Sequence, residues 1–411
     1  MKLTSLCHDR LPAHSTNTAQ LVCTMAEFAR AGHYVEILCR KSGPGNGATR
    51  ESIAAYYGLG SIPESLSFLP LGPAGIDGPL FKGIADILNV LYARRNKPGV
   101  VHTRDIVALT LALSAGLPCV FETYRIDINQ DWRFAVWRAL TYRRKNLLGV
   151  VTHSELCRRS FIEAGVPESR VATIYNGHTP AHFAPSLTRE TARARLNLPL
   201  HAQIATYTGH MDANKGVDIL VRVALELPNV TFLLIGPLPG SREERRVVEL
   251  ARQLGAHNVR VLPRVPHAEV AAYLFASDCL IIPPTAAPLR RHGRTVLPMK
   301  TFSYLAAGRP IVAPDLPDLR EVLRHGDNAL LVPPDDTKAA AESIQLAISD
   351  RVVGGRLGSA AQRDAEQYTW KARAERFSVF LQKVCADAGL PVAQKIASPT
   401  TTPKAFGVEL T

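Results

Sequence analysis

The segment TYTGHMDANKGVDIL, residues 206–220, places a short β-rich run, a glycine-containing loop and an apolar-periodic run in direct succession. The first run ends at Gly209, the loop carries Lys215, and a helix is predicted to begin near Val217. Glycine lets the backbone approach a ligand closely, a helix N-terminus favours anions, and lysine supplies a point charge. The segment therefore predicts a strand–loop–helix unit. Taken alone, it fits a phosphate-binding site and a simple connection with an exposed lysine equally well. The spacing is not that of a Walker loop.

A second segment, RRHGRTVLPMKTFSYLAAGRPIVAPD at residues 290–315, joins clustered arginines to a predicted helix. Pro298 suits the first turn of that helix, and Gly308 suits its end. The preceding loop would then direct backbone N–H groups and arginine side chains toward an anion. For this segment alone, arginines that are merely exposed are the alternative.

Short β-rich apolar runs alternate with longer helical patterns along the chain, which predicts βαβ units and parallel sheets. The expected strands form one series at 2–7, 34–39, 67–71, 100–103, 119–122, 149–152 and 171–175, and a second at 203–208, 231–235, 259–262, 279–282, 310–313 and 329–332. We therefore predict an α/β protein with two Rossmann-like domains facing a cleft. Ligands bind such sheets beyond the carboxyl ends of the strands.

The domain limits follow from these two series. Residues 178–199 are rich in proline and polar residues and are predicted to link the domains. The first domain is expected at 1–180 and the second at 181–388, closed by a helix at about 370–385. Residues 389–411 are predicted to be a disordered tail.

Composition and length favour an ordinary globular protein. The 411 residues suffice for two domains of roughly 100–200 residues each, and 46% are hydrophobic. No apolar run approaches the ~20 residues of a spanning helix, and charged residues follow the first short apolar run too soon for a secretory signal. We therefore expect a cytoplasmic protein. The seven cysteines are scattered without C-x-x-C spacing, which favours buried free thiols.

The formal net charge of +12 implies attraction to polyanions. No nucleic-acid-binding motif accompanies it, so nucleic acid is not expected as a partner. The predicted helix at 131–145 mixes aromatic and basic residues, which would suit docking on an anionic membrane surface. A core-facing aromatic stripe with a solvated basic face is the alternative, and we favour it slightly.

Taken in order, these segments resemble the family 4 retaining glycosyltransferases. The likeness rests on a G-x-x-x-x-x-K-G-x-x-x-L pattern at 209–220 and a form of P-L-K-x-F-E-Y-x-A-A-G-x-P-I-V-A at 298–313. Shorter stretches agree in the same order: 17–20, 31–33, 102–105, 121–122, Ser154, 175–177, 277–278 and 368–370. The resemblance covers residues from about 1 to 385.

The resemblance implies the GT-B fold, with the C-terminal helix crossing back to the first domain. The acceptor, a glycan or lipid-linked molecule, would bind mainly to the first domain, and a nucleotide-diphosphate sugar to the second. Such enzymes use no cofactor and no metal, so cationic side chains and helix dipoles must stabilise the departing diphosphate. Retention is ascribed to a front-face displacement, for which no carboxylate nucleophile is needed.

The resemblance also implies site residues. Lys215 would neutralise the donor diphosphate, the amides around Val296 and Leu297 would hold the distal phosphate, and Arg264 and Val265 would lie near the base. The donor-binding residues expected in this way are Gly209, His210, Lys215, Arg264, Val265, Arg294, Thr295, Val296, Leu297 and Ser303. On the acceptor side they are Asn17, Thr18, Arg104 and Glu122, and the catalytic pair is Lys215 and Tyr124.

Four positions depart from the family pattern. His210 stands where arginine is usual, Ser303 and Thr295 where glutamates are usual, and Tyr124 where histidine is usual. Each change removes a contact worth about 1.5–3 kcal/mol, for which Arg291, Arg294 or Arg125 could compensate. A catalytically degenerate relative that binds a nucleotide-sugar or a partner protein is therefore a second hypothesis. A nucleotide-sugar epimerase of similar fold is a third, which the two segments fit less well.

Structural roles compete with functional ones at several further positions. A cap or salt bridge is as good an account of Glu122 as substrate binding, and Arg104 and Asp105 are expected to form an internal ion pair. Ser154 is predicted to cap a helix. The remaining histidines of interest are expected to be structural or exposed: His102, His153 and His257.

Overall fold

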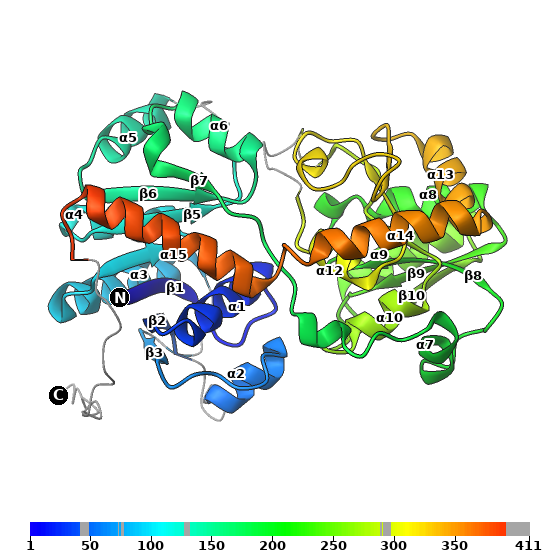
Figure 1. The fold of residues 1–411 in the computed structure, drawn as a ribbon, viewed down its shortest axis with the longest axis horizontal. Coiled ribbons are helices and arrows are strands. Elements are labelled where there is room, and N and C mark those ends of the chain that lie inside the picture. Colours follow the sequence, from blue (N-terminus) through cyan, green and yellow to red (C-terminus); the bar gives the residue numbers. More distant parts are fainter. Residues whose placement is uncertain are drawn as a thin grey trace.

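The computed structural model contains two parallel β-sheets that lie side by side, each covered by helices (Figure 1). It describes residues 1–41, 49–72, 74, 78–126, 132–287, 290 and 297–391, without the side chains of 132–135 and 214. The first sheet has the strand order β3-β2-β1-β4-β5-β6-β7 and the second β10-β9-β8-β11-β12-β13. In both, the order reverses beside the first strand, and ligands bind at such switch points.

The first sheet is built from the N-terminal part of the chain. Its strands are β1 Lys2–Arg10, β2 Tyr34–Arg40, β3 Leu66–Leu71, β4 Val100–Thr103, β5 Cys119–Thr123, β6 Leu147–Thr152 and β7 Val171–Thr173. Its helices are α1 Thr16–Arg30, α2 Arg50–Tyr57, α3 Pro79–Asn96, α4 Ile106–Ser114, α5 Trp132–Tyr142 and α6 Glu155–Glu163. Apolar residues of α3, α4, α5 and α6 share one core, and those of α1 contribute to another.

The second sheet follows after η1 Glu168–Arg170 and η2 Pro180–Phe183. Its strands are β8 Gln203–Thr208, β9 Val230–Ile235, β10 Val259–Leu262, β11 Cys279–Ile281, β12 Ile311–Pro314 and β13 Leu330–Val332. The helical elements around it are α7 Arg189–Arg195, η3 Ala213–Lys215, α8 Val217–Glu226, α9 Arg242–Leu254, α10 Val270–Ala276, α12 Lys300–Ala307, η4 Leu319–Glu321, α13 Thr337–Ser349 and α14 Arg351–Ala365.

The last helix, α15 Trp370–Asp387, returns to the first sheet (Figure 1). It packs on α1, and Phe377, Phe380 and Leu381 enter the core that α1 contributes to. Thr369 caps its first turn by accepting a hydrogen bond from the Ala372 N–H. The predicted fold class is therefore confirmed, including the helix that crosses back. The predicted domain limits stay a prediction.

The expected linker at 178–199 contains a helix that the sequence analysis missed. Thr188 caps α7, and the buried Arg193 side chain fixes the helix against the second domain. Arg193 Nη2 lies 2.6 Å from Asp278 Oδ2, and its Nε donates to the Ala276 carbonyl. Because arginine is rarely buried, the polar composition of the segment concealed this contact.

Two expectations about the chemistry of the chain can also be assessed. All seven cysteines are buried and free, as predicted. Among the described helices, none is both long and apolar enough to cross a bilayer. The predicted tail falls outside the described residues from 392 onward.

Candidate active site

A cleft of about 650 Å³ lies between the carboxyl ends of the two sheets. Residues that follow strands of both sheets line it, so neither sheet forms the cleft alone. They include Arg104 after β4, Tyr124 after β5, Gly209 after β8 and Arg264 after β10. The placement agrees with the general position of ligands in open α/β sheets.

Two glycines leave the carboxyl ends of β8 and β9 bare. Gly209 has φ 137° and Gly236 has φ 143°, a region that other residues rarely adopt. A Cβ atom on Gly236 would lie 2.2 Å from the Gly209 carbonyl oxygen. The two backbones therefore pack directly on each other, and no side chain of either residue occupies the cleft.

The predicted strand–loop–helix unit around Lys215 is confirmed. Lys215 ends η3 and lines the cleft, and Gly216, with φ 68°, begins α8. A Cβ atom on Gly216 would lie 2.1 Å from Thr285 Cγ2, so a side chain there would clash. No described side chain caps the first turn of α8. A lysine beside an uncapped helix N-terminus is a suitable environment for an anion.

The structure brings most of the predicted donor-binding residues together. Those lining the cleft are Gly209, His210, Lys215, Arg264, Val265, Leu297 and Ser303. Burial, followed by the charges of Lys215 and Arg264, lowers the pKa of His210, which favours a neutral imidazole at pH 7. Arg264 Nη2 lies 3.4 Å from the Tyr56 hydroxyl of the first domain. Arg291, Arg294, Thr295 and Val296 lie outside the described residues.

Lys300 was not predicted as a site residue, although it lines the cleft. It is the first residue of α12, one turn before Ser303. The signal was present, because the lysine belongs to the family pattern at 298–313. The resemblance gave that position no role, and only the fold shows that its side chain reaches the Gly209 loop.

On the side of the first domain, Asn17, Arg104 and Tyr124 line the cleft. Arg104 Nη1 donates to the Asn17 carbonyl at 2.9 Å, and the ring of Tyr124 stacks on His153 with 6.3 Å between centroids. The expected ion pair between Arg104 and Asp105 is not among the described interactions. Asp105 instead caps α4 by accepting from the Val107 and Ala108 N–H groups.

Glu122 does not line the cleft, which corrects its predicted place on the acceptor side. It is fully buried, and both carboxylate oxygens are engaged. The partners of Oε1 are Gln20 Nε2 at 2.6 Å, His153 Nε2 at 2.6 Å and Arg373 Nη2 at 2.5 Å, and that of Oε2 is His102 Nε2 at 2.8 Å. The salt-bridge alternative is therefore the correct one.

Neighbouring cations determine whether the Glu122 carboxyl group is ionised. Burial alone would raise the pKa of Glu122, but Arg373 and Arg104, together with hydrogen bonds from both histidines, hold it well below the usual range. Burial also lowers the pKa of His153 to about 4. Glu122 is thus ionised and His153 neutral, with its Nε2–H assigned to Glu122 by the hydrogen-bond pattern.

Thr18 is likewise corrected from an acceptor-side to a structural residue. It is 1% exposed, and its hydroxyl donates to the Ala13 and Ser15 carbonyls at the start of α1. The predicted capping of α6 by Ser154 is confirmed, since its hydroxyl accepts from the Cys157 N–H. His102 is fully buried and His257 is exposed, as expected, whereas His153 is bonded to Glu122 and also lines the cleft.

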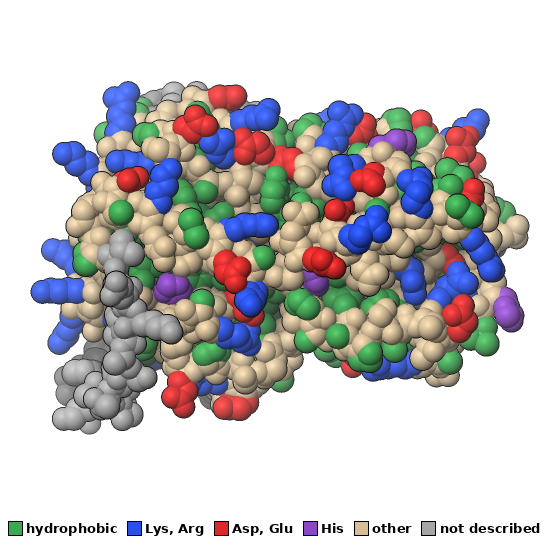
Figure 2. All heavy atoms as spheres, in the orientation of Figure 1, with side chains coloured by type: hydrophobic (Ala, Val, Ile, Leu, Met, Phe, Trp, Pro, Cys, Tyr) green, Lys and Arg blue, Asp and Glu red, His purple; other side chains and the backbone are tan. Residues whose placement is uncertain are grey.

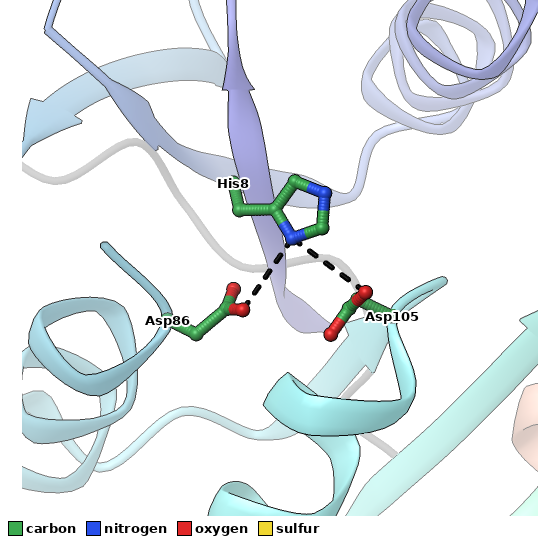
Figure 3. Close-up of side chains that lie close together, drawn as sticks. All are labelled: His8, Asp86 and Asp105. Carbon is green, nitrogen blue, oxygen red and sulfur yellow. Dashed lines mark hydrogen bonds and ion pairs between the residues drawn. The ribbon is translucent and has the colours of Figure 1, made fainter. Parts of the chain in front are cut away.

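A separate cluster joins His8 to Asp86 and Asp105 (Figure 3). His8 Nδ1 lies 3.4 Å from Asp86 Oδ2 and 3.6 Å from Asp105 Oδ2, at the carboxyl end of β1 but outside the cleft lining. Burial opposes protonation of His8, but Asp86, Asp105 and Asp9 outweigh it and raise the pKa of His8. A protonated imidazole can therefore balance these carboxylates without a metal ion. The prediction of no metal stays a prediction.

Family models match both halves of the chain. Residues 202–350 match the family model described as "Glycosyl transferases group 1", and residues 21–182 match the model described as "Glycosyltransferase Family 4". The chain belongs to this glycosyltransferase family. The resemblance seen in the sequence is thereby confirmed, and so is the prediction of a transferase at the level of the family.

Curated relatives of this family 4 member include two proteins named D-inositol 3-phosphate glycosyltransferase. The protein from Corynebacterium efficiens is 24% identical over 90% of this chain and 92% of its own. That from Corynebacterium diphtheriae is 29% identical over 56% of this chain, and the chain spans only 53% of its length.

Solved structures of the same fold support the two-domain architecture. Sucrose-phosphate synthase from Thermosynechococcus elongatus has a TM-score of 0.74 at 19% identity, covering 94% of this chain and all of its own. Anabaena HepE in complex with UDP-glucose has a TM-score of 0.69 at 18% identity, covering 93% and 99%. At these identities the likeness establishes the fold.

Proposed function

We propose that this family 4 member is a retaining glycosyltransferase that uses a nucleotide-diphosphate sugar as donor. The observation that carries the proposal is the cationic face of the cleft on the second domain. There Lys215, Lys300 and Arg264 line the cleft together with the bare backbone at Gly209. Cationic groups already placed around a departing diphosphate stabilise the charge that develops during transfer.

The reaction we propose needs no metal ion and no carboxylate nucleophile. Lys215 and the N-terminus of α8 would bind the diphosphate, and the acceptor hydroxyl would approach from the side of Asn17, Arg104 and Tyr124. The buried Glu122 is not placed to act as a nucleophile, because its oxygens are bonded within the protein and it does not line the cleft. The departing phosphate would itself help to deprotonate the acceptor.

The experiment combines a binding screen with a turnover assay. The purified protein is titrated with UDP- and GDP-sugars, beginning with UDP-glucose because the solved HepE complex contains it. It is then incubated with a bound donor and either D-inositol 3-phosphate, after the names of the relatives, or a membrane lipid extract. We expect release of the nucleoside diphosphate that depends on the acceptor.

The outcomes separate the two hypotheses. Binding of no nucleotide-sugar would contradict the proposal. Binding without turnover would favour the degenerate relative, which the departures at His210 and Ser303 keep open. Turnover with the lipid extract alone would favour a lipid-linked acceptor and a role in envelope or exopolysaccharide synthesis.

We also propose that α5 contacts an anionic membrane from the cytoplasmic side, which would suit a lipid-linked acceptor. The mixture of aromatic and basic residues in this helix suggested the contact, but its described aromatic residues do not support it. Trp137 donates to Thr110 Oγ1 and packs on the buried Tyr142. Support comes from exposed apolar side chains instead, with Leu140 65% and Leu80 of α3 70% exposed. Figure 2 shows basic side chains along the outer edge of the first domain, the end that carries α3, α4 and α5.

Liposome flotation tests this membrane contact. Arg143 and Lys145, which follow α5 and are exposed, are changed together to Glu, with exposed Lys338 and Lys371 changed to Glu as the charge-matched control. Arg144 is left intact because it donates to the Leu113 carbonyl. We expect flotation with anionic vesicles that only the first pair abolishes. Equal flotation of both variants would contradict the proposal.

A further inference from the structure

The amino group of Lys300 lies over an aromatic ring in the lining of the cleft. Its Nζ is 3.5 Å from the centroid of the Tyr207 ring and faces the Gly209 backbone, where a Cβ atom would lie 2.8 Å from it. The side chain is partly buried, and it lines the same cleft as Lys215. The group therefore sits at the carboxyl end of β8, in the centre of the site already described.

The ammonium group has no full counter-charge. Within the described part of the chain, Lys300 forms no hydrogen bond or ion pair, and its recorded contact is the face of Tyr207. An aromatic ring attracts a cation through its quadrupole but does not neutralise it. Two fully buried arginines of the described chain do have a carboxylate partner, Arg373 with Glu122 and Arg193 with Asp278.

The surrounding charges make the position unfavourable in the empty cleft. Burial first, and then the positive charge of Lys215, lower the pKa of the Lys300 amine well below its usual value, against the opposing effect of Asp212. His210 faces the same groups and has a lowered pKa as well. Arg264 adds a further positive charge to the cluster. Cations thus outnumber the one described carboxylate that acts on them.

We propose that Lys300 is a second diphosphate-binding cation of the donor site and acts together with Lys215. This inference rests on the proposed function, since the diphosphate belongs to the nucleotide donor. Lys300 would supply the full charge that arginine usually supplies at the position of His210. The departure at His210 is then compensated from another segment of the chain.

A change of protonation follows from this arrangement. A diphosphate next to Lys300 favours the charged amine, so whatever fraction of the amine is neutral in the empty cleft takes up a proton from the buffer as the ligand binds. At pH 8.5 the phosphate groups are fully ionised and bring no proton of their own, because their second pKa is about 6. Any proton taken up on binding at this pH is therefore taken up by the protein and not by the ligand.

The test is calorimetric titration with UDP, GDP and ADP at pH 8.5, in buffers of different ionisation enthalpy. Lys300→Met keeps the length of the side chain and removes its charge, and Lys338→Met on the exposed face of α13 is the matched control. For the nucleoside diphosphate that binds, we expect Lys300→Met to lose about 10- to 100-fold in affinity. The corresponding monophosphate should lose much less, and proton uptake should fall in this variant only.

Each outcome bears on the inference. If the unaltered protein binds a nucleoside diphosphate and Lys300→Met binds it equally well with the same proton uptake, the inference is wrong and the proposed function stands. If none of the diphosphates binds to the unaltered protein, both fall. Loss of thermal stability without a change in diphosphate affinity would assign Lys300 a structural role over Tyr207. Should Lys300→Met not fold, Lys300→Gln is titrated in its place, and unchanged diphosphate affinity of that variant would overturn the inference.

Discussion

The two domains compensate the charges at or near the cleft in opposite ways. In the first domain, the Glu122 carboxylate is surrounded by Arg373 and two histidines, so the cluster is complete without a ligand. In the second domain, the exposed Lys215 and the partly buried Lys300 both line the cleft, and Asp212 is the one described carboxylate that acts on Lys300. Buried charges are costly unless compensated. A complete cluster therefore indicates a structural role, and an incomplete one indicates a missing ligand.

The largest expected effect comes from making the complete cluster incomplete. Arg373→Met leaves the Glu122 carboxylate buried without the cation that is bonded to it, which should cost about 3–5 kcal/mol of unfolding free energy. Urea unfolding at pH 7 measures it, with Arg376→Met on the exposed face of α15 as control, expected within about 0.5 kcal/mol. Equal stability of the two variants would show that Glu122 does not depend on Arg373.

The same cluster predicts a loss of stability in acid. The folded-state pKa of Glu122 is depressed, so its contribution is present above the ordinary pKa near 4.5 and disappears as the pH falls through the folded value. Arg373→Met should reduce this acid-dependent part of the stability. Urea midpoints between pH 3 and pH 6 check the difference between the two proteins.

Removing a cation from the incomplete cluster of the second domain should weaken ligand binding without lowering the stability of the fold. Lys215→Met should weaken nucleoside-diphosphate binding by about 1.5–3 kcal/mol, because a charge-assisted contact is lost. Its unfolding free energy should stay equal to or above that of the unaltered protein, since a like charge near Lys300 is removed. Calorimetry and urea unfolding measure the two quantities. Unchanged affinity would contradict the assignment of Lys215 to the diphosphate.

The smallest effect is expected at the His8 cluster, where one histidine lies beside Asp86 and Asp105. The raised pKa of His8 means that its contribution is fully present below about pH 6.5 and is lost as the pH rises through the folded value. His8→Gln should remove about 0.5–1 kcal/mol at pH 6 and much less at pH 9. His33, whose pKa is lowered, provides the control, because His33→Gln should not reproduce this pH dependence.

The comparison also explains what the sequence could predict. The strand–loop–helix unit at Lys215 was predictable because its glycines, lysine and helix start lie within a dozen residues. The role of Glu122 was not, since its partners stand at positions 20, 102, 153 and 373 and meet only in the folded chain. α7 was missed because its anchor is a buried arginine, which pattern analysis assigns to the surface. Lys300 was inside a recognised pattern, but its contact with Tyr207 is tertiary.

The return of α15 to the first sheet has a consequence for how the chain is made. Arg373 follows Glu122 by 251 residues, and Phe377 completes the core beside α1. At roughly 5–20 residues per second, a ribosome needs roughly 10–50 s to deliver this arginine after the carboxylate. Until then the first domain lacks the cation that is bonded to Glu122, and its core is unfilled. Its folding is therefore completed after the second domain has been synthesised, and the order of synthesis is not the order of completion.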